Sequence, residues 1–399
     1  MTCFSRSLRG IPNFGLKFKE KTRKMIDTII LSIPKSKFIM LDMTGRGVSS
    51  WDLQARTKAY EKYVKNPSSR DMELGLYFPR LTGYHRKNSE LQWDSIVKVE
   101  FSAPKLIYRN NLDELTDSDF EKVAETLRDR LKRMGAVVSR KELENAPVTA
   151  VHYSKNIELK NGYTAQYVIG ELGKINLNKR FDLTRARYMN DGQSLCAYTQ
   201  THSLVIYDKV ADLVRGKKRS IDREQTLYQL SLFEKLTKAN QPREILRFEI
   251  RLSQKRKMNS LFKKLGFEEN PSFRDVFNSK KSKAVLLHYW DTMLSGNMSL
   301  LFAHSPTTKD LLKQILLTDR KMKAKEAIYR AGLMWALREG NGMRGLRSIL
   351  TKRTNDRTWY RIAADAKEIE AALSRFKPRE WYDQVKSALV NPQPFHIEI

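Results

Sequence analysis

Apolar and polar residues alternate with a period of two in several short segments of the chain, the pattern typical of a β-strand with one buried face. The clearest segment is 246–252, where four apolar residues point one way and Arg247, Glu249 and Arg251 point the other. We expect further strands at residues 29–33, 38–43, 76–81, 95–102, 147–157, 181–189, 194–198 and 203–209.

Three of these other strands also carry polar groups on one face. The groups are Glu100 in residues 95–102, His152 in residues 147–157, and Tyr207 with Lys209 in residues 203–209. If the strands share a sheet, these side chains converge on its open face. The spacing alone does not establish that the strands are neighbours, and a solvated sheet face with cross-strand salt bridges shows the same alternation.

Helical spacing of apolar residues is clearest at residues 116–134, where Thr116 or Ser118 can cap the start and Gly135 follows the end. After residue 266 the strand pattern disappears and helical spacing takes over. Further helices are expected at residues 164–175, 222–238, 279–294, 308–317, 324–337 and 363–376.

This order of elements predicts an α+β fold, with an antiparallel or mixed sheet followed by a helical region. We expect three parts: residues 1–24, a sheet-containing domain at 25–268 and a helical domain at 269–399. The first part is basic and lacks the apolar stretch of a secretory signal. It is interpreted either as a disordered arm or as the result of a start placed upstream of Met25.

Composition limits the location and the partners. The sequence has two cysteines, Cys3 and Cys196, which cannot build a disulfide framework or a cysteine-based zinc site. We therefore expect a reducing cytoplasm. No apolar run in the sequence approaches the ~18 residues of a membrane span. Lys and Arg outnumber Asp and Glu by 74 to 45, a net charge of +29. This excess favours a polyanionic partner, nucleic acid before membrane, although a basic protein can simply be soluble.

A metal site is one expectation from these residues. Two carboxylates and an imidazole, those of Glu100, Glu249 and His152, suit a divalent cation such as Mg²⁺ or Mn²⁺. Such a cation would polarise a phosphate oxygen and orient the scissile bond.

A tyrosine nucleophile is the second expectation from these residues. Tyr207 could attack phosphorus and form a phosphotyrosine bond, with the Lys209 cation favouring its phenolate. Arg247 and Arg251 would hold phosphate oxygens. No His-x-His pair and no Walker-type phosphate loop occurs in the sequence, which argues against the usual histidine-pair nuclease motif and against an ATP-driven motor.

Four segments, in order, resemble the filamentous-phage replication initiators of the gene II protein family. They begin with Met-Ile-Asp-Thr at residue 25 and Val-Glu-Phe-Ser-Ala-Pro-Lys at residue 99, and continue with Leu-Val-Ile-Tyr-Asp-Lys at residue 204 and Leu-Arg-Phe-Glu-Ile-Arg-Leu at residue 246. Residues 285–291 also fit the helical region of that family. The resemblance spans roughly residues 25 to 295 and implies a Rep-like palm of the HUH type.

The resemblance implies a rolling-circle initiator that nicks the origin, stays attached to the 5′ phosphate and later rejoins the displaced strand. Tyr207 matches the nucleophile, and Glu249 and Glu100 match carboxylates that would bind metal. His152 stands where relatives often carry an aspartate, so its role is left open. Val205 stands where plasmid relatives carry an arginine, so Lys209 or Arg247 would have to bind the phosphate.

The resemblance implies the cytoplasm of a bacterial host as the location. The partners that it implies are double-stranded origin DNA, the displaced single strand, and a host helicase and polymerase. Residues 344–353 and 355–361 suggest a helix-turn-helix-like DNA reader, with a helical packing domain as the alternative. A non-catalytic origin-binding or operator-binding protein of the same fold remains the competing function. The sequence does not indicate the oligomeric state.

Overall fold

The computed structural model describes residues 25–41, 60–65, 75–87, 93–175, 186–189, 192–214, 243–294, 311–312, 315–316, 322–338, 342–351, 353–373 and 380–397. None of the helices within these ranges combines the length and the apolar character that crossing a membrane requires.

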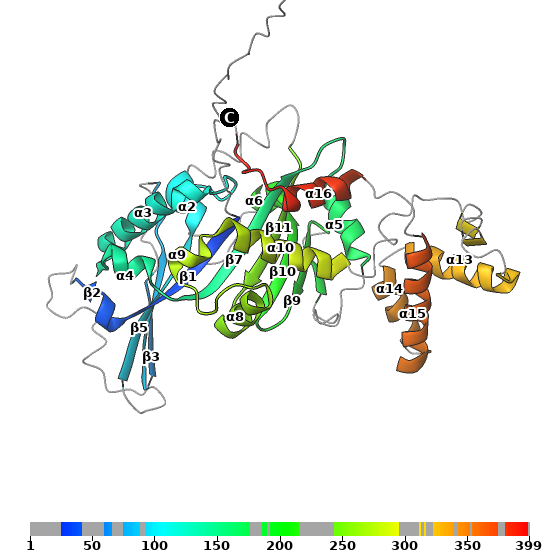
Figure 1. Cartoon of the computed structure of the whole chain (residues 1–399), viewed down its shortest axis with the longest axis horizontal. Helices are drawn as coiled ribbons and strands as arrows, with labels where there is room; N and C mark the ends of the chain where they lie inside the picture. The colour runs from blue at the N-terminus through cyan, green and yellow to red at the C-terminus, as the bar shows by residue number, and fades with distance from the viewer. Residues whose placement is uncertain are drawn as a thin grey trace, which may run out of the picture.

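The fold is α+β, as expected, and is built on one antiparallel sheet (Figure 1). Its nine described strands, in spatial order, are β3 (Tyr60–Lys65), β4 (Arg80–Lys87), β5 (Trp93–Ser102), β1 (Ile26–Pro34), β7 (Val148–Glu158), β11 (Ile245–Leu252), β10 (His202–Asp208), β9 (Ser194–Tyr198) and β8 (Ala186–Met189). A second, two-stranded sheet pairs β2 (Ile39–Met40) with β6 (Ala136–Val137).

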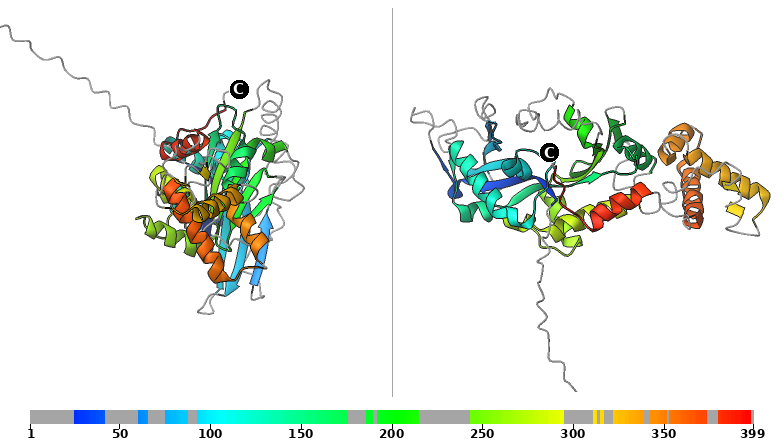
Figure 2. Two further views of the ribbon diagram at one scale, coloured as in Figure 1. Left: turned by 90° about the vertical axis from the view of Figure 1, so that its right-hand side faces the viewer. Right: turned by 90° about the horizontal axis from the view of Figure 1, so that it is seen from above.

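One face of the large sheet is apolar and packs against helices (Figure 2). These helices are α3 (Phe120–Arg133), α8 (Lys255–Lys264), α9 (Phe273–Val276), α10 (Ser279–Leu294) and α16 (Glu380–Val390). Phe248 of β11 meets Trp290 of α10 with ring centroids 5.8 Å apart, and Phe101 of β5 meets Phe273 at 5.6 Å. The alternation in residues 246–252 therefore turns its apolar side to this core and its charged side to the opposite face.

The start of the helix at residues 116–134 shows how local sequence sets an element. The backbone N–H and hydroxyl of Thr116 donate to Asp119 at 2.6 and 2.8 Å, which forms a capping box. Gly135 follows with a φ of 84°, a conformation that glycine adopts without strain. The amphipathic helix α3 lies between these two signals.

The hydrophobic core of the sheet continues beyond residue 268. Trp290 of α10 stacks on Tyr382 of α16 with centroids 5.7 Å apart, and both helices belong to that core. The division into domains stays a prediction, but α10 and α16 pack with the sheet.

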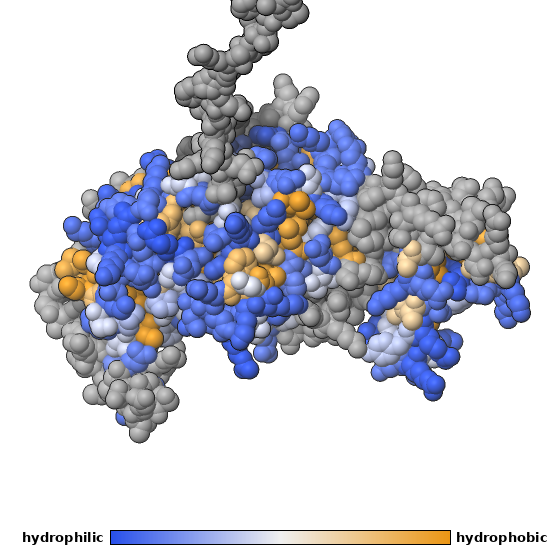
Figure 3. All heavy atoms as spheres, in the orientation of Figure 1, coloured by the Kyte–Doolittle hydropathy of each residue, from blue (hydrophilic) through white to orange (hydrophobic). Residues whose placement is uncertain are grey.

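Three other helices share a separate hydrophobic cluster that includes Met334 and Trp359. They are α13 (Ala324–Arg338), α14 (Gly342–Leu350) and α15 (Asp356–Leu373), drawn in orange in Figure 1. Residues 351 and 353, between α14 and α15, have turn conformation and lie in the region expected to read DNA. Figure 3 shows that the described surface facing the viewer is mostly hydrophilic, in keeping with the charged composition.

Several predicted elements differ from the structure. The strand expected at 76–81 begins at Arg80. Of the strand expected at 38–43, residues 39–40 form β2, which pairs with β6 outside the large sheet, and residues 42–43 lie outside the described residues. The helix expected at 222–238 lies outside the described residues. The remaining described helices are α2 (Ala103–Tyr108), α4 (Arg140–Glu144), α5 (Ala165–Gly173) and α6 (Lys209–Val214).

Candidate active site

Strand register brings most of the predicted site residues to one place. Tyr207 of β10 lies opposite Arg247 of β11, and Arg251 of β11 lies opposite His152 of β7. Glu249 sits between the two arginines on the same strand. Directly paired residues of an antiparallel sheet point to the same face, so these side chains gather on the polar side of the sheet.

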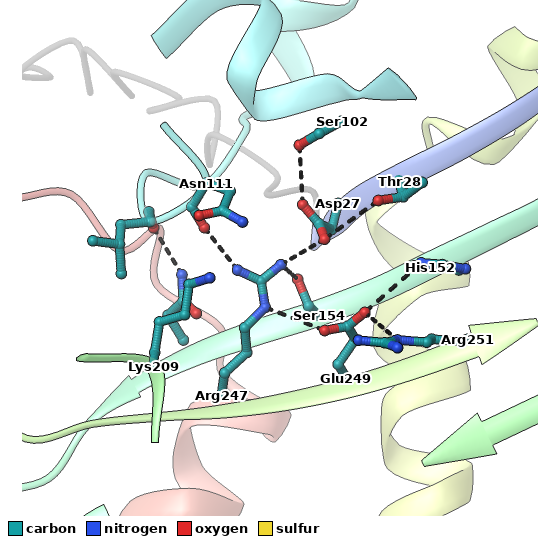
Figure 4. Close-up of polar contacts among 12 residues, drawn as sticks. Asp27, Thr28, Ser102, Asn111, His152, Ser154, Lys209, Arg247, Glu249 and Arg251 are labelled. Atoms are coloured by element: carbon teal, nitrogen blue, oxygen red, sulfur yellow. Dashed lines mark hydrogen bonds and ion pairs between the residues drawn. The ribbon is translucent and has the colours of Figure 1, made fainter. Parts of the chain in front are cut away.

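The Glu249 carboxylate is the centre of this cluster (Figure 4). Its Oε1 accepts a hydrogen bond from Arg251 Nε at 2.8 Å and lies 3.7 Å from His152 Nδ1. Its Oε2 accepts from the Tyr207 hydroxyl at 3.1 Å and lies 3.6 Å from Arg247 Nε. The Glu249 side chain is only 2% exposed, so its charge depends on these partners instead of on water.

Arg247 ties this carboxylate to the rest of the fold. Its Nη2 pairs with Asp27 Oδ2 at 2.9 Å and donates to Ser154 Oγ at 2.8 Å, while its Nη1 donates to the Asn111 carbonyl at 2.7 Å. The side chain is 1% exposed. Asp27 is in turn held by the Ser102 hydroxyl at 3.1 Å, so strands β1, β5, β7 and β11 all contribute to the network.

The charges of the cluster fix its protonation states. Burial alone would raise the pKa of Glu249, but the cations of Arg251 and Arg247 outweigh burial and hold that pKa well below its ordinary value. Burial lowers the pKa of His152 to about 4, although Glu249 pulls it the other way. At neutral pH, Glu249 is therefore ionised and His152 is neutral.

Tyr207 is a buried phenol in this arrangement. The residue is 9% exposed, and burial raises its pKa well above 10, against the smaller opposing effect of Arg247. Its hydroxyl is therefore protonated at neutral pH and donates its proton to Glu249. The expected proximity of a tyrosine, a carboxylate and two arginines is present, but the expected phenolate is not.

Lys209 does not take the place predicted for it. Strand β10 ends at Asp208, whose carboxylate caps helix α6 by accepting from the Ala211 N–H at 2.9 Å, so Lys209 begins that helix. Its Nζ lies 5.6 Å from the centroid of the Tyr207 ring. The residue is 1% exposed, and burial lowers its pKa to about 7. Lys209 is thus too buried to meet a phosphate in this structure.

Glu100 lies far from the cluster. It pairs with Ile30 of β1, which pairs with Ala150 of β7, whereas Glu249 pairs with Ser154. Four residues along the strand and three strand spacings across the sheet amount to roughly 19 Å. Glu100, His152 and Glu249 therefore do not surround one cation.

The fit of a divalent metal can be judged from the donor atoms. No group of three His, Cys, Asp or Glu side chains suited to a metal occurs within the part of the chain that the structure describes. Both oxygens of Glu249 are engaged by arginine and tyrosine donors, and Asp27 is paired with Arg247. As arranged, these residues do not fit the expected Mg²⁺ or Mn²⁺ site, and we derive no step through a metal.

Sequence reasoning missed Asp27, Ser154 and the Asn111 carbonyl, all of which hold Arg247. Asp27 carried a signal, since it is a lone carboxylate in an apolar strand. A register irregularity in β1 between Ile26 and Ile29 accompanies its position on the polar face. A backbone carbonyl gives no sequence signal at all.

Comparisons with protein-family models, with curated proteins and with solved structures give no match to this chain. The fold and site define an α+β protein with an antiparallel sheet and a tyrosine–carboxylate–arginine cluster on its polar face. The relation to filamentous-phage initiators stays a prediction that rests on the sequence segments alone.

Proposed function

We propose that this chain is a DNA-nicking and DNA-joining enzyme that initiates rolling-circle replication, with Tyr207 as its nucleophile. One observation carries the proposal: the Tyr207 hydroxyl donates to Glu249 at 3.1 Å, and two arginines flank the same carboxylate. A hydroxyl nucleophile that is hydrogen-bonded to a carboxylate base, with cations nearby to bind phosphate, suits phosphoryl transfer to tyrosine.

The chemistry is a transesterification. Tyr207 Oη attacks phosphorus while its proton passes to Glu249 Oε2, a bond forms between Oη and phosphorus, and the bond from phosphorus to the 3′ oxygen breaks. The leaving 3′ oxygen takes a proton from water, the hydroxide so formed takes the proton from Glu249, and the 5′ phosphate remains on the tyrosine. The reverse attack by a 3′ hydroxyl rejoins the strand, and no ATP is needed because the phosphodiester energy is kept.

The surplus positive charge supports DNA as the substrate. With a net charge of +29, phosphate contacts and counterion release would supply much of the affinity. Origin recognition is assigned to α14 and α15, where a nine-residue helix is followed after five residues by a longer helix. The displaced single strand, a host helicase and a polymerase are the further partners of such a reaction.

A second function, origin or operator binding without cleavage, is favoured by the burial of Tyr207. A phenol that is 9% exposed, with a raised pKa, is a poor nucleophile until the site opens. On this view, the cluster is a structural ion network within a DNA-binding protein.

A nicking assay separates the two functions. Supercoiled plasmids that carry DNA from the replicon encoding the chain are incubated with the protein, with and without Mg²⁺ or Mn²⁺. The enzyme is expected to relax them, and Tyr207→Phe is expected to abolish relaxation. Tyr198→Phe on the neighbouring strand and Glu100→Gln on the same sheet are matched controls that keep it. Tight binding without relaxation would support the non-catalytic function.

A further inference from the structure

Arg251 is half-exposed and is the most exposed side chain of the cluster around Glu249. Its side chain is 40% exposed, whereas that of Glu249 is 2% exposed and that of Arg247 is 1% exposed. Arg247 is also committed to Asp27, Ser154 and Asn111. Of the two arginines on Glu249, Arg251 is therefore the one whose guanidinium can reach a ligand without unfolding the network.

The two carboxylate oxygens of Glu249 bind different partners, and the shared carboxylate couples those partners to each other. Oε1 is bound by Arg251 at 2.8 Å, and Oε2 is bound by the Tyr207 hydroxyl at 3.1 Å. The cation that neutralises the carboxylate thus weakens the same group as a base toward the phenol. Losing Arg251 would strengthen that base at the oxygen that already holds the proton of Tyr207.

We propose that Arg251 couples phosphate binding to activation of Tyr207: a phosphate of the DNA backbone takes the Arg251 guanidinium from Glu249, and Glu249 then accepts the proton of Tyr207. The inference rests on the proposed function. Arginine binds phosphate through paired N–H donors, so the exchange replaces one charge-assisted contact with another. The proton moves from Tyr207 Oη to Glu249 Oε2, and no other group gains or loses one.

The neighbouring charges are consistent with this coupling. Among the described residues, the ionisable groups around Glu249 are Asp27 from β1, His152 from β7, Tyr207 from β10, and Arg247 and Arg251 from β11, and Cys196 of β9 lies near Arg251. Asp27 is paired with Arg247 and His152 is neutral, so among the residues that the structure describes it is Arg251 that can move between the carboxylate and a phosphate. Burial keeps the Tyr207 phenol protonated in the absence of DNA, so a stronger base at Glu249 is needed to activate it.

The phosphate contact is tested first without any cleavage. Binding of the full chain carrying Tyr207→Phe to labelled oligothymidine is measured by fluorescence anisotropy over a range of salt concentrations. Adding Arg251→Gln is expected to reduce the slope of log K against log salt by about 0.7, the loss of one contact to a single-strand phosphate. Arg128→Gln is the matched control, because Arg128 is 43% exposed, paired with Glu125, and lies on α3 across the sheet.

The release of Glu249 is tested by kinetics on the plasmid that the wild-type protein nicks. Arg251→Gln is expected to raise KM about 10-fold while kcat stays within about 3-fold, because the carboxylate is already free in this variant. Glu249→Gln is expected to lower kcat at least about 100-fold through loss of the base. An arginine that only held the structure together would lower kcat in both variants.

The outcomes distinguish this inference from the function on which it rests. Failure of the protein to bind oligothymidine and to nick any plasmid overturns the proposed function. Nicking by the wild type, with the same salt slope for Arg251→Gln as for Arg128→Gln, overturns the phosphate contact. A loss of kcat in Arg251→Gln as large as that in Glu249→Gln overturns the release of the base.

Discussion

The two arginines on Glu249 should differ sharply in their contributions to stability, although they lie two residues apart on one strand. Arg247 is 1% exposed and Arg251 is 40% exposed, and both contact the same carboxylate. Replacing each with methionine removes the charge and keeps most of the side-chain volume. The pair therefore compares a buried ion with a half-exposed one at nearly constant surroundings.

The magnitude follows from what each change leaves behind. Arg247→Met leaves Asp27 without its cation at 2.9 Å and removes hydrogen bonds to Ser154 and Asn111. Removing one partner of a buried ion pair typically costs about 3–5 kcal/mol, a large part of the total stability of a domain. Arg251→Met leaves the buried Glu249 Oε1 without its donor at 2.8 Å, but Arg247 and the Tyr207 hydroxyl still contact that carboxylate, so we expect a smaller cost of about 1–2 kcal/mol.

Urea unfolding of both variants, followed by circular dichroism, measures this difference. The midpoint for Arg247→Met is expected far below that of the wild type, with an unchanged m-value, and the midpoint for Arg251→Met is expected between the two. Arg247→Lys keeps the charge without the planar fork and should fall between them. Equal midpoints for the two methionine variants would refute the description of a buried, internally satisfied Arg247.

The remaining predictions concern pH and the helical region. Burial lowers the pKa of Lys209 in the folded protein to about 7, below its unfolded value, so the unfolded chain binds more protons above pH 7. Between pH 7 and 9, the free energy of unfolding of the wild type should therefore rise by about 2 kcal/mol relative to that of Lys209→Met, as measured by urea unfolding. Burial lowers the pKa values of His152 and His202 to about 4, so the free energy of unfolding should fall as the pH drops from about 6.5 to 4. The fall should be smaller in the double variant His152→Asn, His202→Asn, and an equal fall in both proteins would contradict this. Replacing residues 295–379 with a Gly/Ser linker of about 15 residues should preserve cooperative unfolding in calorimetry and weaken duplex-origin binding in anisotropy. Ending the chain at residue 294 should abolish cooperative unfolding because α16, which belongs to the core of the sheet, is lost. Intact duplex-origin binding by the linker variant would remove the assignment of a DNA reader to this region.

Sequence patterns predicted the elements well where one face is buried. The charged side of residues 246–252 and the position of Tyr207 follow from a period of two, and residues 279–294 coincide with α10. The register that places Tyr207 opposite Arg247 cannot be predicted from the sequence of either strand. It depends on packing between segments some forty residues apart in sequence, which periodicity does not encode.

The errors at the site have physical causes. Lys209 was assigned to a strand because the alternation continues through it, but the Asp208 cap ends the strand one residue earlier. Glu100 shares the polar pattern of Glu249, but a pattern gives the face of a residue and not its distance from another. Tyr207 is buried by neighbours on several elements, so the local sequence around it does not predict its burial.

The central claim is that Tyr207 forms a covalent bond with DNA, and mapping the linked residue tests it most directly. After a nicking reaction is quenched in denaturant, the DNA is trimmed by nuclease and the protein is digested with trypsin. The expected nucleotide-bearing peptide spans residues 188–209, which contain Tyr188, Tyr198 and Tyr207, so fragmentation must locate the added mass. The account predicts the modification on Tyr207 and its loss in Tyr207→Phe. An adduct on another residue, or nicking with no adduct, would contradict it.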